Sequence, residues 1–200
     1  TNFVSSLLNF LQFRPEIYVE LRTKSTQIRA LLSRSPNPNV VVAFSLSPTK
    51  TADHFEKKTP TIKKRLEAMR RLAKHGWLLG LRFDPLIYDD SFDERYSNLF
   101  REVFQTLPIE TIHSVTLGVF RMPKRFFQSI SNLYPEEPLF SSPLSNQSSL
   151  MTYDANLEKQ LLNFCMRELT NYIEPERVFS CEIQNRKQLD EINYKLITKK

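Results

Sequence analysis

The clearest hydrophobic patterns predict a strand, a helix and a second strand near the start of the chain. Residues 16–25 alternate apolar and polar positions, and residues 39–47 contain a continuous apolar run from Val40 to Phe44. Alternation is typical of a half-buried strand, and a continuous run of a strand covered on both faces. Residues 25–35 lie between them and carry apolar positions at helical spacing. Together the three segments predict one βαβ unit.

The alternation of strand and helix continues to residue 183. Proline and serine are frequent in residues 134–149, for which we expect a long ordered loop or lid rather than a domain linker. Five alternations of strand and helix predict an α/β fold with parallel strands, which form either an open sheet or part of a (β/α) barrel. A closed eight-unit barrel is excluded because the chain has too few strands. Further strands are predicted at 77–83, 112–119 and 177–183, and helices at 4–13, 60–74, 91–107, 124–130 and 154–173.

Composition favours a globular protein. The 200 residues are 40% hydrophobic and 12% aromatic, and we expect one domain over residues 1–200. No apolar run approaches the length of a membrane span, and the first residues do not resemble a signal peptide. Two cysteines far apart in the sequence, Cys165 and Cys181, argue against a disulfide scaffold and favour a cytoplasmic location. The oligomeric state stays open.

Charge and glycine content limit the possible partners. Lys and Arg outnumber Asp and Glu by 28 to 22, a net charge of +6 that permits a polyanionic partner without requiring one. Only three glycines occur, so the glycine-rich phosphate loops of nucleotide-binding proteins are excluded. The histidines His54, His75 and His113 have no ligand spacing, so we predict no metal site.

Two side chains at predicted strand ends are the first candidates for ligand binding. Lys24 directly follows the first strand, and Ser45 ends the second. Ligands of parallel α/β folds bind at the carboxyl ends of the strands, where an ammonium and a hydroxyl could hold a carboxylate or a phosphate. The alternative is a solvated loop lysine and a turn serine.

Other charged residues allow both functional and structural interpretations. Arg82 and Asp84 are two residues apart, so they share one side of an extended segment and could form a structural ion pair or a polar edge of the site. Beyond the fourth strand, Arg121, Lys124 and Arg125 could contact phosphates or simply be surface residues. We interpret the basic residues of the helix at 60–74 as a solvated surface: Lys63, Lys64, Arg65, Arg70, Arg71 and Lys74.

Four segments in a fixed order give a family resemblance. They are ELRTKS (20–25), AFSLSP (43–48), GLRFDPLI (80–87) and LGVFR (117–121), each at a strand end. This order resembles the spore photoproduct lyase family of radical S-adenosylmethionine (SAM) enzymes, over residues 5–183. The resemblance implies a partial six-unit (β/α) barrel, of which this chain holds the later strands and the C-terminal part.

The resemblance also implies residue roles. Lys24 and Ser45 match the lysine and serine that bind the methionine moiety of SAM. Met151-Thr152-Tyr153 resembles the family's Met-Arg-Tyr segment near the DNA lesion, which implies a substrate-side position for Tyr153. Thr152 takes the place of this arginine. The chain therefore departs from the family sequence in the segment that lies near the lesion, a thymine photolesion in DNA. Cys181 matches a family cysteine, to which we assign no catalytic role.

The family's CxxxCxxC motif for a [4Fe-4S] cluster does not occur in this sequence. In the family it lies upstream of the matched segments, so we expect this chain to be inactive alone and an N-terminally extended version to supply the cluster. One alternative is a basic α/β module that binds nucleic acid without radical chemistry. Another is a truncated product without function.

Overall fold

The structure is a computed structural model that describes residues 2–147 and 149–181. Within these ranges, five strands form one parallel sheet in the order β1-β2-β3-β4-β8. The predicted α/β fold with parallel strands is therefore confirmed. The strands are β1 (Val19–Thr23), β2 (Val40–Ser45), β3 (Leu78–Leu86), β4 (Ile112–Val119) and β8 (Val178–Ser180).

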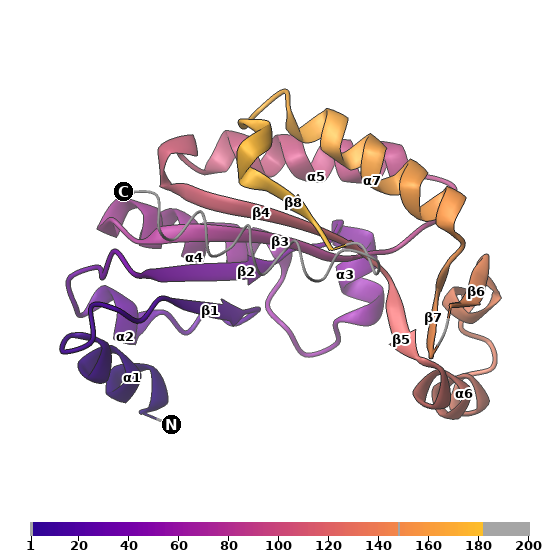
Figure 1. Ribbon diagram of the computed structural model, residues 1–200, viewed down its shortest axis with the longest axis horizontal. Helices are drawn as coiled ribbons and strands as arrows, with labels where there is room; N and C mark the ends of the chain where they lie inside the picture. The colour runs from indigo at the N-terminus through magenta and orange to yellow at the C-terminus, as the bar shows by residue number, and fades with distance from the viewer. Residues whose placement is uncertain (1, 148, 182–200) are drawn as a thin grey trace.

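Helices connect the strands of the described part of the chain. Figure 1 shows α5 and α7 side by side along β4 and β8, and α1 and α2 near β1. α3 lies at the end of the sheet where the strands terminate. The helices are α1 (Phe3–Leu11), α2 (Arg29–Leu32), α3 (Thr49–Phe55), α4 (Ile62–His75), α5 (Phe92–Thr106), α6 (Lys124–Leu133) and α7 (Ala155–Leu169), with short 3-10 turns η1 (Ile109–Thr111), η2 (Pro138–Ser141) and η3 (Pro175–Arg177).

The two faces of the parallel sheet differ sharply in polarity. Successive side chains of a strand point to opposite faces, and paired residues on neighbouring strands share a face. One face carries the fully buried apolar core beneath the helices, including Phe44, Leu81 and Leu117. Apart from Val41 and Leu78, the other face carries charged, hydroxyl and small residues: Glu20, Arg22, Ala43, Ser45, Gly80, Arg82, Ser114 and Thr116. We call this second surface the polar face.

Local sequence signals account for both ends of α4 and for the start of α7. Asp154 caps α7, because its side chain accepts hydrogen bonds from the Asn156 and Leu157 backbone N–H groups. Gly76 ends α4 with a left-handed φ of 98°, which glycine adopts without steric cost. The helix predicted from residue 60 begins at Ile62 instead, and its N-cap is Thr61, whose side chain accepts from the Lys64 N–H.

A second sheet was not predicted. Its strands β5 (Arg121–Pro123), β7 (Leu150–Tyr153) and β6 (Leu144–Gln147) pair antiparallel in that order. The region 134–149, expected to be a loop, thus contains η2 and β6. Strands of three or four residues are too short for alternation to be recognised in a sequence. Figure 1 shows this sheet and α6 beyond the carboxyl ends of β3 and β4.

Two further predictions concern the C-terminal part of the chain. The strand predicted at 177–183 is observed at Val178–Ser180, and its last two residues lie outside the described part of the chain. The helix-like tail expected after residue 185 also lies outside it. Among the described residues, no helix has the length and apolar character needed to cross a membrane.

Candidate functional site at the carboxyl edge of the sheet

Lys24 lies just beyond the carboxyl end of β1 and contacts a carboxylate that follows α3. Its ammonium donates a 2.8 Å hydrogen bond to Oε1 of Glu56. The Ser47 hydroxyl donates to the same oxygen at 3.4 Å. The side chain of Lys24 is 38% exposed and that of Glu56 only 10%. Lys24 is therefore an oriented, partly accessible cation rather than a freely moving loop lysine.

Arg65 holds the second oxygen of Glu56 from the buried side. Its guanidinium is fully buried and pairs with Glu56 Oε2. It also donates to the backbone carbonyl of Ser45 at 3.0 Å, to the Pro60 carbonyl at 2.9 Å and to the Thr59 hydroxyl at 2.7 Å. The interpretation of Arg65 as a solvated surface residue is wrong. A fully buried guanidinium requires this complete set of acceptors.

The ionisation of Glu56 follows from these contacts. Burial disfavours the charged carboxylate, but hydrogen bonds from Lys24 and then Arg65 outweigh burial and hold the pKa of Glu56 below its ordinary value. Glu56 is therefore an anion at neutral pH. The trio of Lys24, Glu56 and Arg65 carries a net charge of +1.

Ser45 ends β2 on the polar face and is nearly buried, with 7% of its surface exposed. Its hydroxyl accepts a 3.3 Å hydrogen bond from Nε of Arg22 on the neighbouring strand. Within the described residues, Lys24 and Ser45 share no direct hydrogen bond. They are connected indirectly, through Glu56 and Arg65 to the Ser45 carbonyl.

Asp84 lies between two arginines at the end of β3. Arg121 donates to Asp84 Oδ2 at 3.1 Å, and a terminal nitrogen of Arg22 lies 3.6 Å from the same oxygen. A Cβ on Gly118 would lie 2.8 Å from the Arg121 guanidinium and 3.0 Å from the Asp84 carboxylate. The absence of a side chain at position 118 therefore leaves room for the Asp84–Arg121 pair.

Arg82 and Asp84 do share the polar face, but they do not pair with each other. The Arg82 guanidinium binds both oxygens of Glu20, and it also donates to the hydroxyl and carbonyl of Ser114. Residues two apart on one strand face are nearly 7 Å apart, whereas neighbouring strands are closer. Each charge therefore pairs across strands rather than along its own strand.

The three predicted basic residues beyond β4 lie in different settings. Arg121 begins β5 and is engaged by Asp84 and by the Val119 carbonyl, at 3.1 Å each. Lys124 and Arg125 are exposed in the first turn of α6. Cations at a helix N-terminus oppose the helix dipole, typically by about 0.3–1 kcal/mol each. A bound anion would remove this penalty.

Tyr153, the predicted substrate-side residue, is fully buried at the end of β7. Its hydroxyl accepts a 2.9 Å hydrogen bond from the Tyr88 backbone N–H. Burial raises the pKa of Tyr153 to about 12. Thr152, which the resemblance matches to an arginine of the family, is also buried and donates to the Phe120 carbonyl at 2.7 Å.

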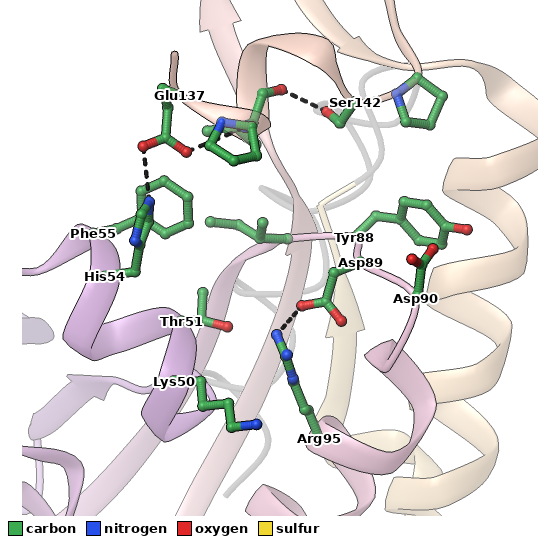
Figure 2. A pocket seen from close by; sticks show the side chains of 14 residues that line it. Lys50, Thr51, His54, Phe55, Tyr88, Asp89, Asp90, Arg95, Glu137 and Ser142 are labelled. Atoms are coloured by element: carbon green, nitrogen blue, oxygen red, sulfur yellow. Dashed lines mark hydrogen bonds and ion pairs between the residues drawn. The ribbon is translucent and has the colours of Figure 1, made fainter. Parts of the chain in front are cut away.

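A cavity of about 430 Å³ lies next to this edge, between α3, the segment after β3 and η2. Figure 2 shows that His54 and Glu137 pair across one wall and that Asp89 and Arg95 pair across another. The distance from His54 Nε2 to Glu137 Oε2 is 2.8 Å. The cavity is large enough for a small ligand. Its lining residues are Lys50, Thr51, His54, Phe55, Ile87, Tyr88, Asp89, Asp90, Arg95, Glu137, Pro138, Leu139, Ser142 and Pro143.

The cysteines do not fit an iron–sulfur cluster. Cys165 is fully buried in the core, and burial raises its pKa, so it stays a thiol. Burial also raises the pKa of Cys181, which follows β8. Cluster ligands are thiolates, and two separated thiols do not supply a cluster. Among residues 2–147 and 149–181, no three His, Cys, Asp or Glu side chains form a metal-binding group.

The sequence model of the family described as "Spore photoproduct lyase" matches residues 1–142. The chain belongs to the spore photoproduct lyase family. The resemblance inferred from the four strand-end segments is thereby confirmed. Two curated relatives, both named spore photoproduct lyase, come from Bacillus subtilis strain 168 and Geobacillus sp. strain Y412MC61. They are 29% and 28% identical over 58% of this chain and 35% of their own length.

Solved structures of spore photoproduct lyase share the fold. A cysteine-to-serine mutant superposes with a TM-score of 0.76 at 19% identity, covering 90% of this chain and 55% of that one. A complex of a double mutant with bound AdoMet and dinucleoside spore photoproduct superposes with a TM-score of 0.72 at 20% identity, covering 88% and 54%. The chain thus spans about half the length of these solved relatives, and the partial-barrel architecture is confirmed.

Sequence reasoning singled out Lys24 and Ser45 as candidates but not Glu56 and Arg65, which connect them in the structure. One signal for Arg65 was available. It lies three residues after Ile62 and four before Met69, so it falls within the apolar stripe of α4 rather than outside it. Glu56 has no comparable signal, because it is the C-cap of the short helix α3.

Proposed function

We propose that this chain is the SAM-binding portion of a spore photoproduct lyase-type enzyme, and that Lys24 and Ser45 bind the methionine moiety of SAM. One observation carries the proposal. The two residues end neighbouring parallel strands, where ligands of such folds bind, in a chain that belongs to this family. One solved relative contains bound AdoMet, which is the same molecule.

The donor set suits this ligand. The Lys24 ammonium has three N–H groups, of which Glu56 uses one, so a carboxylate can accept from the others. SAM, once bound beside a reduced iron–sulfur cluster, supplies a radical.

We further infer that the [4Fe-4S] cluster is supplied by a segment beyond this sequence, and that this chain alone has no radical activity. The two cysteines of the chain do not fit a cluster. The proposed substrate is a thymine photolesion in DNA or a related substrate, since three solved structures of relatives are complexes with dinucleoside spore photoproduct. Anaerobic iron reconstitution is the test: a bound, reducible cluster on the 200-residue chain would contradict this inference.

SAM titration by calorimetry tests the binding site. Lys24→Ala should weaken SAM binding about tenfold or more, because it removes a charge-assisted hydrogen bond. Lys63→Ala, on the exposed part of α4, is the matched control and should leave the affinity unchanged. Equal affinities for wild type and Lys24→Ala would contradict the proposal.

A second function, nucleic-acid binding without radical chemistry, is favoured by one specific observation. Lys124 and Arg125 are exposed in the first turn of α6, where their charges are unfavourable without an anion. In this case Lys124→Ala combined with Arg125→Ala should lower the affinity for duplex DNA and reduce its salt dependence. Lys24→Ala should then leave DNA binding intact.

A further inference from the structure

Glu56 connects the two residues of the proposed SAM site, although sequence and family resemblance gave it no role. Oε1 accepts from the Lys24 ammonium at 2.8 Å, and Oε2 pairs with the buried Arg65 guanidinium. Arg65 in turn donates to the Ser45 carbonyl at 3.0 Å. A continuous series of charged contacts therefore runs from the end of β1 to the end of β2.

This series is anchored at its buried end. Arg65 is fully buried, and its other donors bind Pro60 and Thr59. Its position cannot change without breaking several hydrogen bonds in a site of low dielectric. Glu56 is held by this anchor and is itself only 10% exposed in its side chain. The most accessible member is Lys24, with 38% of its side chain exposed.

A lysine side chain is a flexible stem with a single point charge, and it loses considerable rotamer freedom when it is ordered. When a ligand binds a disordered lysine, the entropy that the side chain loses lowers the affinity. A lysine already held by a fixed carboxylate has lost this freedom before the ligand arrives, which raises affinity through preorganisation. The hydrogen bond to Glu56 also fixes the directions of the two remaining N–H groups.

We propose that Glu56 is a positioning residue that fixes the Lys24 ammonium relative to Ser45 for the carboxylate of SAM. The inference rests on the proposed SAM site and adds the residue on which its geometry depends. Glu56 does not contact the ligand carboxylate, because two anions would repel. It acts through Lys24, while Arg65, which also donates to the Ser45 carbonyl, holds Glu56 in place from the buried side.

A double-mutant cycle on SAM affinity tests the proposal. Lys24→Met should weaken binding about tenfold or more, and Glu56→Gln about three- to tenfold. The double variant should bind no more weakly than Lys24→Met alone, since Glu56 has nothing to position once the ammonium is absent. Glu67→Gln is the matched control, because Glu67 is an exposed carboxylate of α4 that pairs with Arg70 at 2.9 Å.

The outcomes separate the two proposals. If Lys24→Met leaves the affinity unchanged, the SAM site itself is wrong. If Lys24→Met weakens binding but Glu56→Gln does not, or strengthens it, only the role of Glu56 is overturned. Additive losses in the double variant would show that Glu56 acts independently of Lys24, and they too would overturn it.

Folding must be checked, because Glu56→Gln removes the charge partner of a buried arginine. If Glu56→Gln does not fold, Glu56→Asp keeps a carboxylate near Arg65 but shortens the reach toward Lys24. This variant should keep most of the thermal stability and still lose SAM affinity. Wild-type affinity for Glu56→Asp would contradict the proposal.

Discussion

Arg121 donates a 3.1 Å hydrogen bond to Asp84 and so joins the beginning of the antiparallel sheet to the end of β3. The two residues are 37 positions apart in the sequence. Arg22 approaches the same carboxylate from β1, at 3.6 Å. The ends of three elements are therefore held around one largely buried acid at the edge where the proposed ligand binds.

Gly118→Ala should weaken this arrangement. The new Cβ would lie 2.8 Å from the Arg121 guanidinium and 3.0 Å from the Asp84 carboxylate, so the pair must shift. We expect a loss of about 1–2 kcal/mol in the free energy of unfolding, measured with urea, as for other overpacked sites. In an Arg121→Ala background the cost should fall, because the guanidinium is absent. An equal loss of unfolding free energy in both backgrounds would show that the strain does not come from the contact with Arg121.

Glu56 should contribute an acid-sensitive part of the stability. Its pKa in the folded protein lies below the ordinary 4.5, so the unfolded chain binds the proton more readily. The contribution is thus complete above about pH 4.5 and is lost as the pH falls through the folded pKa. The stability difference between wild type and Glu56→Gln should therefore shrink on acidification, as followed by urea unfolding at several pH values. A difference that does not vary with pH would contradict this.

Tyr153→Phe should destabilise the protein without changing the packing of the ring. The hydroxyl is the acceptor for the Tyr88 N–H, at 2.9 Å, and its loss should cost about 1–2 kcal/mol in thermal or urea unfolding. Tyr134→Phe is the control, since Tyr134 is 62% exposed and should tolerate the change. In an alkaline absorbance titration, Tyr153 should ionise after the exposed tyrosines, near its raised pKa of about 12.

The two thiols should react slowly and in a defined order. Burial raises the pKa of both Cys165 and Cys181, so little thiolate is present at neutral pH. Cys181 is partly exposed and should be alkylated first, whereas fully buried Cys165 should be alkylated only when the protein unfolds. Mass spectrometry of iodoacetamide-treated Cys165→Ala and Cys181→Ala variants distinguishes the two sites. Rapid labelling of Cys165 in the native protein would refute the buried placement.

The pattern of polar and apolar positions determined the main architecture. The continuous run at Val40–Phe44, the strand at Ile112–Val119 and the Asp154 cap all follow from local rules, and all are observed. The predicted strand ends also placed Lys24 and Ser45 at one edge of the sheet. Parallel strands joined by helices must end on the same side of a sheet.

Tertiary structure alone decided which charges meet. Lys24 pairs with Glu56, 32 positions away, and Arg82 with Glu20, 62 positions away. A period of two or 3.6 residues tells which face a side chain occupies, but not which residue of another element lies opposite. That neighbour depends on strand order and on the path of the connecting helices. For this reason the sequence indicated Lys24, while its carboxylate partner and the buried arginine behind it became visible only in the folded chain.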